Sequence, residues 1–383
     1  MDTIVFTGGG TGGHVYPGLA VLSALPEKDR QRVVWIGSRH GVERGIVSDA
    51  GVPFWGIPAG KLRRYFDWQN LWDVIRVFAG VHAAWRLLGR LGVSVVFSKG
   101  GYVAVPVVVA AWLRGIPVLI HESDADPGLA TRLTGPLAKR IFLPYHETLP
   151  RFPQRLQRRA SVIGNPVRRG FFSADPAGVL EALGIDDPGL PVVVVTGGSL
   201  GALQINTLVH DTISSLTRRA VVIHQVGDHS KEMIPEITRR AVTGRYHGAP
   251  SFGSVFPALL RRADLVVARA GAGTIWEIAV TGRPSVLIPL SSGASRGDQM
   301  RNARRYCRDG TPAVVLDDPE LSAERFLAVI CALLDSPQRR QAMSDAASCW
   351  GRSDGAERLA REILVHSGSI LPAAVEIPSR RNT

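Results

Sequence analysis

The chain has few cysteines and no long hydrophobic run. Cys307, Cys331 and Cys349 are odd in number and lack the spacing of a metal site, so we expect reduced thiols. The longest apolar stretch, Val103 to Leu113, is broken by Pro106 and falls well short of the roughly 20 residues of a transmembrane helix. The first residues read as a strand and a glycine loop, not as an export signal. These absences favour a cytoplasmic protein.

Acidic residues are scarce relative to basic ones. The chain has 33 Asp and Glu against 45 Lys and Arg, which gives a formal net charge of +12. Such an excess indicates an anionic partner, which can be nucleic acid, anionic lipid headgroups or a phosphorylated substrate. The chain lacks a compact basic block with interleaved aromatics, zinc-finger spacing and an RNP-like strand, and these absences disfavour nucleic acid.

What is present is an alternation of short β-branched runs with helical patterns, typical of parallel α/β domains. A length of 383 residues suits two such domains. We predict two Rossmann-like, doubly wound parallel-sheet domains facing a cleft, with residues 1–163 in the first and 164–366 in the second. Residues 338–365 should be helical and can return to the first domain, and residues 367–383 should be disordered. The predicted strands are Thr3 to Thr7, Val33 to Ile36, Val93 to Ser98, Val118 to His121, Arg140 to Leu143, Val192 to Thr196, Val221 to Gln225, Leu265 to Ala268, Ser285 to Ile288 and Val314 to Leu316.

Three glycine-rich turns follow predicted strands. They are Gly8 to Gly13, Lys99 to Tyr102 and Gly197 to Ala202. Such a turn lets the backbone approach a phosphate and directs free N–H groups and the positive end of a helix toward it. Tight turning alone also explains a single loop, but three loops favour binding of a diphosphate. None ends in the Lys-Ser/Thr of a Walker loop, and the first lacks dinucleotide spacing, so ATP and NAD are disfavoured and no cofactor is expected.

Two ionisable residues lie where a helix follows a strand. His14 comes directly after the first glycine loop, where an imidazole facing the crevice could act as a general base or only as a positioning group. Glu277 lies about one turn inside a predicted helix, where its carboxylate could accept hydrogen bonds from ribose hydroxyls or only complement the helix dipole. Further along, Asp298, Gln299 and Asn302 have helical spacing and could present amides to a sugar.

A stripe of large apolar residues runs along the predicted helix from Leu71 to Arg90. Aromatics flanked by arginine suit an interfacial membrane patch, although core packing is the alternative. Basic residues at 61, 63 and 64 favour the membrane interpretation. The predicted membrane contacts are Trp72, Ile75, Phe78, Trp85 and Trp112.

Taken together, seven segments resemble the MurG family, in the family's order and spacing over about residues 1–350. They are Gly8 to Gly18 (GGGTGGHVYPG), Gly60 to Arg64 (GKLRR), Ser98 to Val105 (SKGGYVAV), Ile120 to Arg132 (IHESDADPGLATR), Gly197 to Ala202 (GGSLGA), Arg269 to Glu277 (RAGAGTIWE) and Ser295 to Ala303 (SRGDQMRNA). The resemblance implies a GT-B fold and inverting transfer of N-acetylglucosamine from UDP-GlcNAc to the C4 hydroxyl of MurNAc in lipid I, the undecaprenyl-pyrophosphoryl-MurNAc-pentapeptide. The product, lipid II, serves peptidoglycan synthesis. The protein would act peripherally on the cytoplasmic side of the cell membrane.

The resemblance also implies roles for residues. The donor would bind mainly to the C-terminal domain and the acceptor to the N-terminal one. His14 would be the base, with Glu122 as its rival. The donor diphosphate or the acceptor would lie beside Thr11, Gly12 and Gly13, and phosphate and nucleotide would contact Arg168 and Ser199. The diphosphate would also be lined by Ala272, Gly273, Thr274, Ile275 and Trp276. Glu277 would hold the ribose, and Gln299 would contact the sugar.

Some positions depart from the family pattern. Asp124 stands where many members carry Asn, Leu200 where Gln is frequent, and Asp298 where a Gln pair often begins. We include Asp124 and Asp298 among the expected substrate contacts. Asp124 and Asp126 also resemble the DxD metal motif of other glycosyltransferases. In a two-Rossmann transferase, helix ends and basic side chains can neutralise the leaving diphosphate, so we expect no metal.

Two other functions stay open. A related transferase could use another lipid acceptor such as diacylglycerol. A non-hydrolysing UDP-GlcNAc epimerase would share the architecture and the donor, but its acidic catalytic set is not recognisable here.

Overall fold

A computed structural model describes residues 2–60, 68–185, 189–198, 200–290, 297–318, 320–350 and 354–371. The predictions for Lys61, Arg63, Arg64 and Ser199 lie outside these residues, as does the side chain of Trp72. The chain divides into two compact units, which are described separately. Unit 1 contains residues 1–168 and 354–383, and unit 2 contains residues 169–353.

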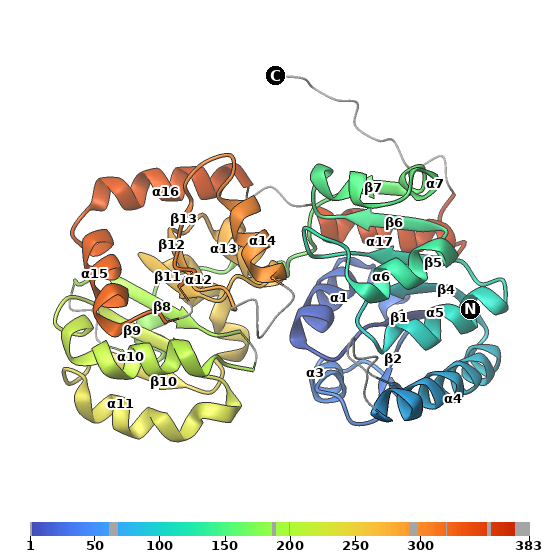
Figure 1. Cartoon of the computed structure of the whole chain (residues 1–383), viewed down its shortest axis with the longest axis horizontal. Helices are drawn as coiled ribbons and strands as arrows, with labels where there is room; N and C mark the ends of the chain where they lie inside the picture. Colours follow the sequence, from blue (N-terminus) through green and yellow to red (C-terminus); the bar gives the residue numbers. More distant parts are fainter. Residues whose placement is uncertain are drawn as a thin grey trace. The chain divides into compact units, whose positions relative to one another are not determined.

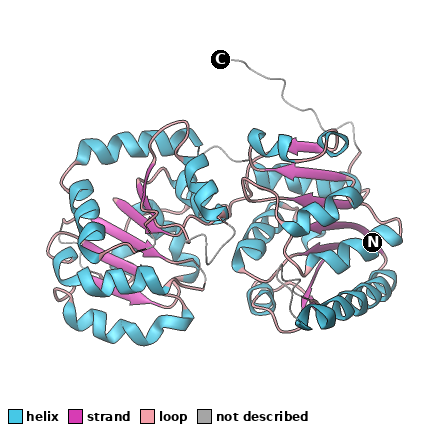
Figure 2. Cartoon of the chain, in the orientation of Figure 1, coloured by secondary structure: helices cyan, strands magenta, loops and turns pink. Residues whose placement is uncertain are grey.

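Unit 1 is built on a parallel sheet of seven strands in the described ranges, in the order β3-β2-β1-β4-β5-β6-β7, with helices on both faces (Figures 1 and 2). The strands are β1 Thr3–Thr7, β2 Val33–Ser38, β3 Phe54–Ile57, β4 Val93–Ser98, β5 Val118–His121, β6 Arg140–Leu143 and β7 Ala160–Val162. The helices are α1 Gly12–Ala24, α2 Glu27–Arg30, α3 Glu43–Asp49, α4 Trp68–Leu91, α5 Ala104–Leu113, α6 Leu129–Thr134, η1 Gly135–Leu137, η2 His146–Arg151, α7 Gln154–Gln157 and α17 Gly355–His366.

Alternate residues of the unit 1 strands build two cores. Ile4 and Phe6 of β1 face a core that includes Leu359 and Ile363 of α17, whereas Val5 faces a second core under α4 and α5. Because both faces are buried, the central strands β1 and β4 are mainly apolar, as is typical of parallel strands covered by helices.

The C-terminal part of the chain returns to unit 1. α17 packs against α1 (Figure 1). Within the stretch 338–365, which was expected to be helical and able to return to the first domain, α16 (Pro337–Trp350) lies in unit 2 and α17 (Gly355–His366) in unit 1. Beyond α17, Ser369 accepts a hydrogen bond from Arg32 Nη1 (2.7 Å) and donates one to Asp29 Oδ1 (3.3 Å). Residues 367–371 therefore belong to the folded unit, which corrects the expectation that a disordered tail begins at residue 367.

Unit 2 repeats the design with six parallel strands among its described residues, in the order β10-β9-β8-β11-β12-β13. The strands are β8 Val192–Thr196, β9 Val221–Gln225, β10 Tyr246–Ala249, β11 Leu265–Ala268, β12 Ser285–Leu287 and β13 Ala313–Val315. The helices are α8 Gly170–Ser173, α9 Val179–Ala182, α10 Leu203–Leu216, η3 Asp228–Met233, α11 Ile234–Arg240, η4 Gly253–Val255, α12 Phe256–Arg262, α13 Ala272–Thr281, α14 Asp298–Tyr306, α15 Ala323–Leu334 and α16 Pro337–Trp350.

The two units therefore confirm the predicted pair of doubly wound parallel-sheet domains. None of the helices in the described ranges is both long enough and apolar enough to span a bilayer.

Candidate functional site

In unit 1 the strand order reverses between β1 and β4, because the chain moves outward to β2 and β3 on one side and to β5 on the other. Loops diverge at the carboxyl ends of such a strand pair, and this switch point is where open α/β sheets bind ligands. The loops that meet there carry Gly8 to Thr11 after β1 and Lys99 to Val103 after β4. The fold thus brings two of the predicted glycine turns to one place.

These two turns touch so closely that side chains would not fit. Gly101 has φ +79°, and a Cβ atom on it would lie 2.4 Å from the carbonyl oxygen of Gly9. A Cβ on Gly9 would in turn lie 2.5 Å from the carboxyl carbon of Glu43. Both positions require glycine because of close approach, and Gly101 also because of its left-handed backbone.

Glu43, at the start of α3, holds the first glycine turn from below. Its side chain is fully buried. Oε2 accepts a hydrogen bond from Gly10 N (3.1 Å), and Oε1 accepts one from Ser38 N (2.8 Å). No sequence pattern indicates this role, because only the packing of α3 against β2 brings the carboxylate to the turn.

His14 lies in the first turn of α1 and is half-buried. Its Nδ1 lies 3.2 Å from the carbonyl oxygen of Lys99. A carbonyl can only accept, so Nδ1 carries the proton and Nε2 keeps its lone pair. Burial and the charge of Lys99 lower the pKa of His14 below 6.5, against the opposing effect of Glu122 and Glu43. The imidazole is therefore neutral at pH 7 and able to take a proton at Nε2.

Lys99 is buried beneath His14, with 2% of its surface exposed. Its Nζ donates to Nδ1 of His121 (2.6 Å) and to Oγ of Ser123 (2.6 Å). Nε2 of His121 donates to the carbonyl oxygen of Gly164 (2.9 Å), which leaves Nδ1 as the acceptor for Lys99. Burial lowers the pKa of Lys99 to about 7, although the carboxylates of Glu122 and Asp124 oppose this change.

Glu122 follows β5 and shapes the next loop. Its Oε1 accepts from the backbone N–H groups of Ser123 (2.8 Å) and Asp124 (3.1 Å), and Oε2 accepts from that of Gly128 (3.0 Å). With 5% of its surface exposed, the carboxylate already accepts from three backbone donors. This arrangement suits a group that holds the loop rather than a base that takes a proton from substrate.

The remaining predicted residues of unit 1 lie around this centre. Thr11 is exposed and precedes α1 with extended backbone, so Gly12 and Gly13 begin the helix. The guanidinium of Arg168 lies over the ring of Tyr16 in α1, with its Cζ 4.9 Å from the ring centroid. Asp124 is half-buried in the loop after β5, and Asp126 pairs with Arg151, whose Nε lies 3.1 Å from Oδ1.

Unit 2 has its own switch point, between β8 and β11. Gly198 and Gly201 follow β8 with φ of +86° and +78°. A Cβ on Gly201 would lie 2.2 Å from the carbonyl oxygen of Val226, so this turn, like the one in unit 1, needs glycine for close approach. The loop after β11 leads into α13, whose first residue is Ala272.

Arg269 lies just before α13 and has 8% of its surface exposed. Its Nη1 donates to Gln204 Oε1 (2.8 Å) and to the carbonyl oxygens of Ile288 (3.1 Å) and Pro289 (3.3 Å). Burial lowers its pKa from the ordinary value of an arginine, yet a guanidinium stays charged at pH 7. Arg269 precedes the first residue of α13 by three positions, so one loop carries both a fixed positive charge and a helix N-terminus, which suits a bound anion.

The side chains of α13 divide between packing and exposure. Ala272, Ile275 and Trp276 are buried, and the Trp276 ring packs on that of Trp350 with centroids 5.9 Å apart. A ligand at this helix start would therefore meet main-chain groups and the half-buried Gly273 and Thr274. Glu277 is half-buried and lies beyond the first turn, which weakens the interpretation that it only complements the helix dipole.

The residues predicted for the sugar lie at the start of α14. Gln299 Oε1 accepts from the backbone N–H of Leu290 (3.0 Å) and so braces the segment that follows β12. Asp298 pairs with Arg301 one turn later, which places a cation beside the carboxylate that departs from the family pattern. Asn302 is buried.

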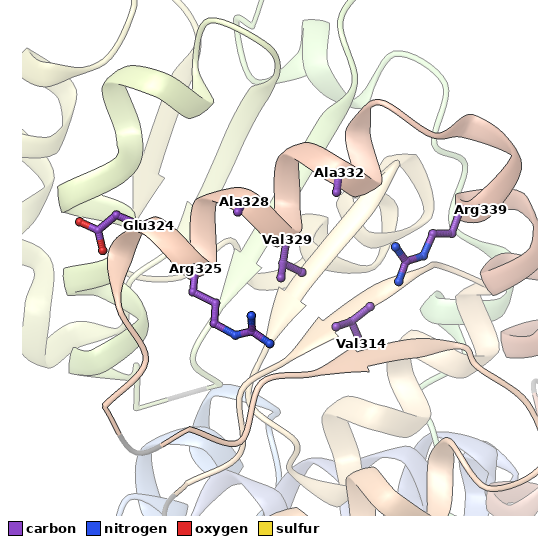
Figure 3. Close-up of a pocket in the computed structure, with 7 residues that line it drawn as sticks. All are labelled: Val314, Glu324, Arg325, Ala328, Val329, Ala332 and Arg339. Carbon is purple, nitrogen blue, oxygen red and sulfur yellow. The ribbon is translucent and has the colours of Figure 1, made fainter.

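A hollow in unit 2 lies away from these loops. It has a volume of about 440 Å³ and lies between β13, α15 and α16. Figure 3 shows Arg325 and Arg339 extending toward it beside Val314 and Val329. None of the predicted site residues lines it, so we assign it no part in the site.

The aromatic stripe of unit 1 is exposed. On α4, Ile75, Phe78 and Trp85 have 51%, 71% and 43% of their surface exposed, and Trp112 on α5 has 53%. Arg114 stacks over Trp85, with Cζ 4.0 Å from the ring centroid. These four side chains do not belong to the core, and large exposed apolar side chains on neighbouring helices are typical of an interaction surface.

Comparison with known proteins identifies relatives over nearly the whole chain. A model of the glycosyltransferase family 28 N-terminal domain matches residues 4–143, and a model of the family 28 C-terminal domain matches residues 192–359. The UDP-N-acetylglucosamine--N-acetylmuramyl-(pentapeptide) pyrophosphoryl-undecaprenol N-acetylglucosamine transferase of Treponema pallidum (strain Nichols) is 40% identical over 364 residues, 94% of each protein. The enzyme of the same name from Treponema denticola is 43% identical over 332 residues, 83% of this chain and 85% of that protein.

A solved structure shares the fold. The crystal structure of Acinetobacter baumannii MurG matches with a TM-score of 0.69 and 24% identity, over 95% of this chain and 99% of that chain. At this identity the structural match shows the fold, and the relatives above show the family. The chain therefore belongs to the MurG family of N-acetylglucosaminyltransferases, within glycosyltransferase family 28.

Proposed function

We propose that this protein transfers N-acetylglucosamine from UDP-GlcNAc to the C4 hydroxyl of MurNAc in undecaprenyl-pyrophosphoryl-MurNAc-pentapeptide, lipid I. The product would be lipid II, the precursor for peptidoglycan synthesis. Support comes from relatives named for this reaction, which match over 94% of their length and of this chain. The glycine-lined switch points of the two units supply the phosphate-binding backbone that such a reaction needs.

The reaction needs one proton acceptor and one anion site. The C4 oxygen of the acceptor attacks the anomeric carbon of the donor while its proton passes to Nε2 of His14. The new O4–C1 bond forms as the bond from C1 to the β-phosphate oxygen breaks, and UDP leaves with the electron pair. A single displacement inverts the anomeric centre. The first N–H groups of α13, with Arg269 close behind them, would stabilise the charge on the departing diphosphate.

The observation that carries this proposal is the state of His14. Its Nδ1–H is held by the Lys99 carbonyl, its Nε2 is unprotonated, and burial keeps its pKa below 6.5. A neutral imidazole at the start of a helix meets the requirements of a general base at neutral pH. Glu122 becomes the residue that orders the loop after β5, since backbone N–H groups engage both of its oxygens.

Transfer of radiolabel from UDP-GlcNAc to synthetic lipid I tests this function. We expect labelled lipid II, and no product when diacylglycerol replaces lipid I. Labelled diacylglycerol would indicate a transferase with another acceptor. Conversion of free UDP-GlcNAc to its 2-epimer without any acceptor would indicate the epimerase, and either result would overturn the proposal.

We also propose that unit 1 binds an anionic membrane surface through the exposed stripe, defined as Ile75, Phe78, Trp85 and Trp112, on the cytoplasmic side of the membrane. Apolar rings can enter the interface while Arg76, Arg86 and Arg90, all exposed on α4, contact anionic headgroups. This contact would bring the protein to an acceptor whose lipid chain stays in the bilayer. Vesicle sedimentation tests it: binding should be stronger to anionic than to neutral vesicles, and equal binding would contradict it.

A further inference from the structure

The most deeply buried cation of the unit 1 switch point is not used by the proposed reaction. Lys99 exposes only 2% of its surface, and both hydrogen-bond partners of its Nζ, His121 and Ser123, are buried as well. Burying an ammonium group costs folding free energy that an apolar side chain would not. A group retained at this cost under a predicted active site needs an explanation.

Lys99 touches the predicted base through its main chain and the loop after β5 through its side chain. Its carbonyl oxygen accepts the Nδ1–H of His14, and its Nζ donates to His121 and Ser123. Lys99 is closely packed against the first glycine turn, because a Cβ on Gly8 would lie 3.0 Å from Lys99 Cβ. One residue thus connects the helix that carries His14 to the loop that Glu122 orders.

We propose that Lys99 is a positioning residue for His14: its carbonyl fixes the imidazole tautomer, and its buried ammonium group favours the unprotonated imidazole. The inference rests on the proposed role of His14 as the base. It adds a device that maintains the base in its reactive form as the pH falls.

The charges around the pair define the expected effect. The charge of Lys99, in the loop after β4, lowers the pKa of His14. The carboxylates of Glu122, in the loop after β5, and of Glu43, in α3, raise it. The carboxylates of Glu122 and Asp124 raise the pKa of Lys99. His121, which lies beside Lys99, has a pKa far below 6.5 and is therefore neutral. Removing the ammonium group leaves burial to lower the pKa of His14, while Glu122, the Lys99 carbonyl and Glu43 still raise it. Its pKa must then rise, because carboxylates favour the imidazolium.

The test compares Lys99→Met and Lys99→Gln, which remove the charge, with Lys99→Arg, which keeps it. Lys28→Met, which removes an exposed lysine of unit 1, is the matched control. The acidic limb of kcat/KM against pH should move upward by on the order of one pH unit in both uncharged variants. It should stay in place in Lys99→Arg and in the control. A loss of rate in Lys99→Met and Lys99→Gln with an unmoved acidic limb would overturn the proposal, because that is the result of a purely structural role.

A second measurement separates this inference from the proposed function. Histidine labelled with 13C at Cε1 reports the His14 titration by NMR without any substrate, and a His14→Gln spectrum assigns the signal. The same upward shift is expected in the uncharged variants. If the shift appears while no lipid II forms, the proposed function fails and the coupling between Lys99 and His14 stands. An unshifted titration would refute the coupling itself.

If the uncharged variants do not fold, the His14 titration of the wild-type protein tests the proposal. The His14 signal should then show a second inflection near pH 7, where Lys99 loses its proton. A single inflection would overturn the proposal.

Discussion

The switch points of the two units share one backbone design and differ in what lies beneath it. In both, a strand leads through glycines into a helix, and a glycine approaches a neighbouring carbonyl too closely for any side chain. Beneath the unit 1 loops lie Lys99, whose pKa burial lowers to about 7, and His14, whose pKa burial lowers below 6.5. Beside the helix start of unit 2 lies Arg269, which stays charged. The backbone thus suits anions in either unit, whereas we propose that proton transfer takes place in unit 1.

The largest effect is expected from His14→Ala, which removes the proposed base of unit 1. We expect turnover to fall by about 10² to 10⁴-fold, because the acceptor hydroxyl loses its base. UDP affinity should change little, since in this account unit 2 holds the nucleotide. Steady-state transfer and calorimetric UDP binding measure the two effects. An equal loss of both would make His14 a binding or structural residue.

Lys99→Met should change how the stability of the protein depends on pH. The folded pKa of Lys99, about 7, lies below the ordinary 10.5. Between these values the unfolded chain binds a proton that the folded chain lacks, so this group makes stability rise with pH. The variant should therefore gain most in Tm below pH 7, and its advantage should disappear as the pH approaches 10.5. Melting curves of wild type and variant at several pH values, with Lys28→Met as control, measure this; a difference that does not vary with pH would contradict it.

Glu277→Ala tests the binding role of unit 2. Losing hydrogen bonds from a carboxylate to ribose should weaken UDP-GlcNAc binding by about 10 to 100-fold. Glu324→Ala removes an exposed acid from the first turn of α15 and is the control for a helix-dipole effect. Equilibrium dialysis should show a loss of affinity in the first variant alone. Unchanged donor affinity in Glu277→Ala would remove the ribose role.

The smallest effect is expected at the exposed stripe of unit 1. Phe78→Ser should weaken vesicle binding by about tenfold or less, because one side chain loses its partial burial in the interface. Leu203→Ser, in unit 2, changes a residue of similar exposure, 68% against 71% for Phe78, and should leave sedimentation with vesicles unchanged. Equal losses in both variants would mean that vesicle binding does not distinguish the units.

The sequence predicted the central strands and missed three others, β3, β7 and β10. All three lie at sheet edges. Their residues are half-buried or exposed for the most part, whereas those of β8 and β11 are buried throughout. An edge strand is covered less, so it lacks the continuous apolar run that marks a parallel strand.

The sequence patterns also predicted part of the candidate site. His14 and Glu277 were identifiable because each follows a strand and a glycine turn at short range, and the order of the chain fixes that relation. Lys99, His121 and Glu43 were missed as working groups. Their roles depend on neighbours brought together by strand pairing and by the packing of α3, and periodicity does not report such contacts.

Hydrogen exchange of the full chain with and without UDP tests most directly the claim that unit 2 holds the nucleotide while unit 1 supplies the base. The account predicts that UDP slows exchange most at the first turn of α13, residues 272–275, and less at the start of α1, residues 12–15. Strong protection at α1 with none at α13 would contradict it.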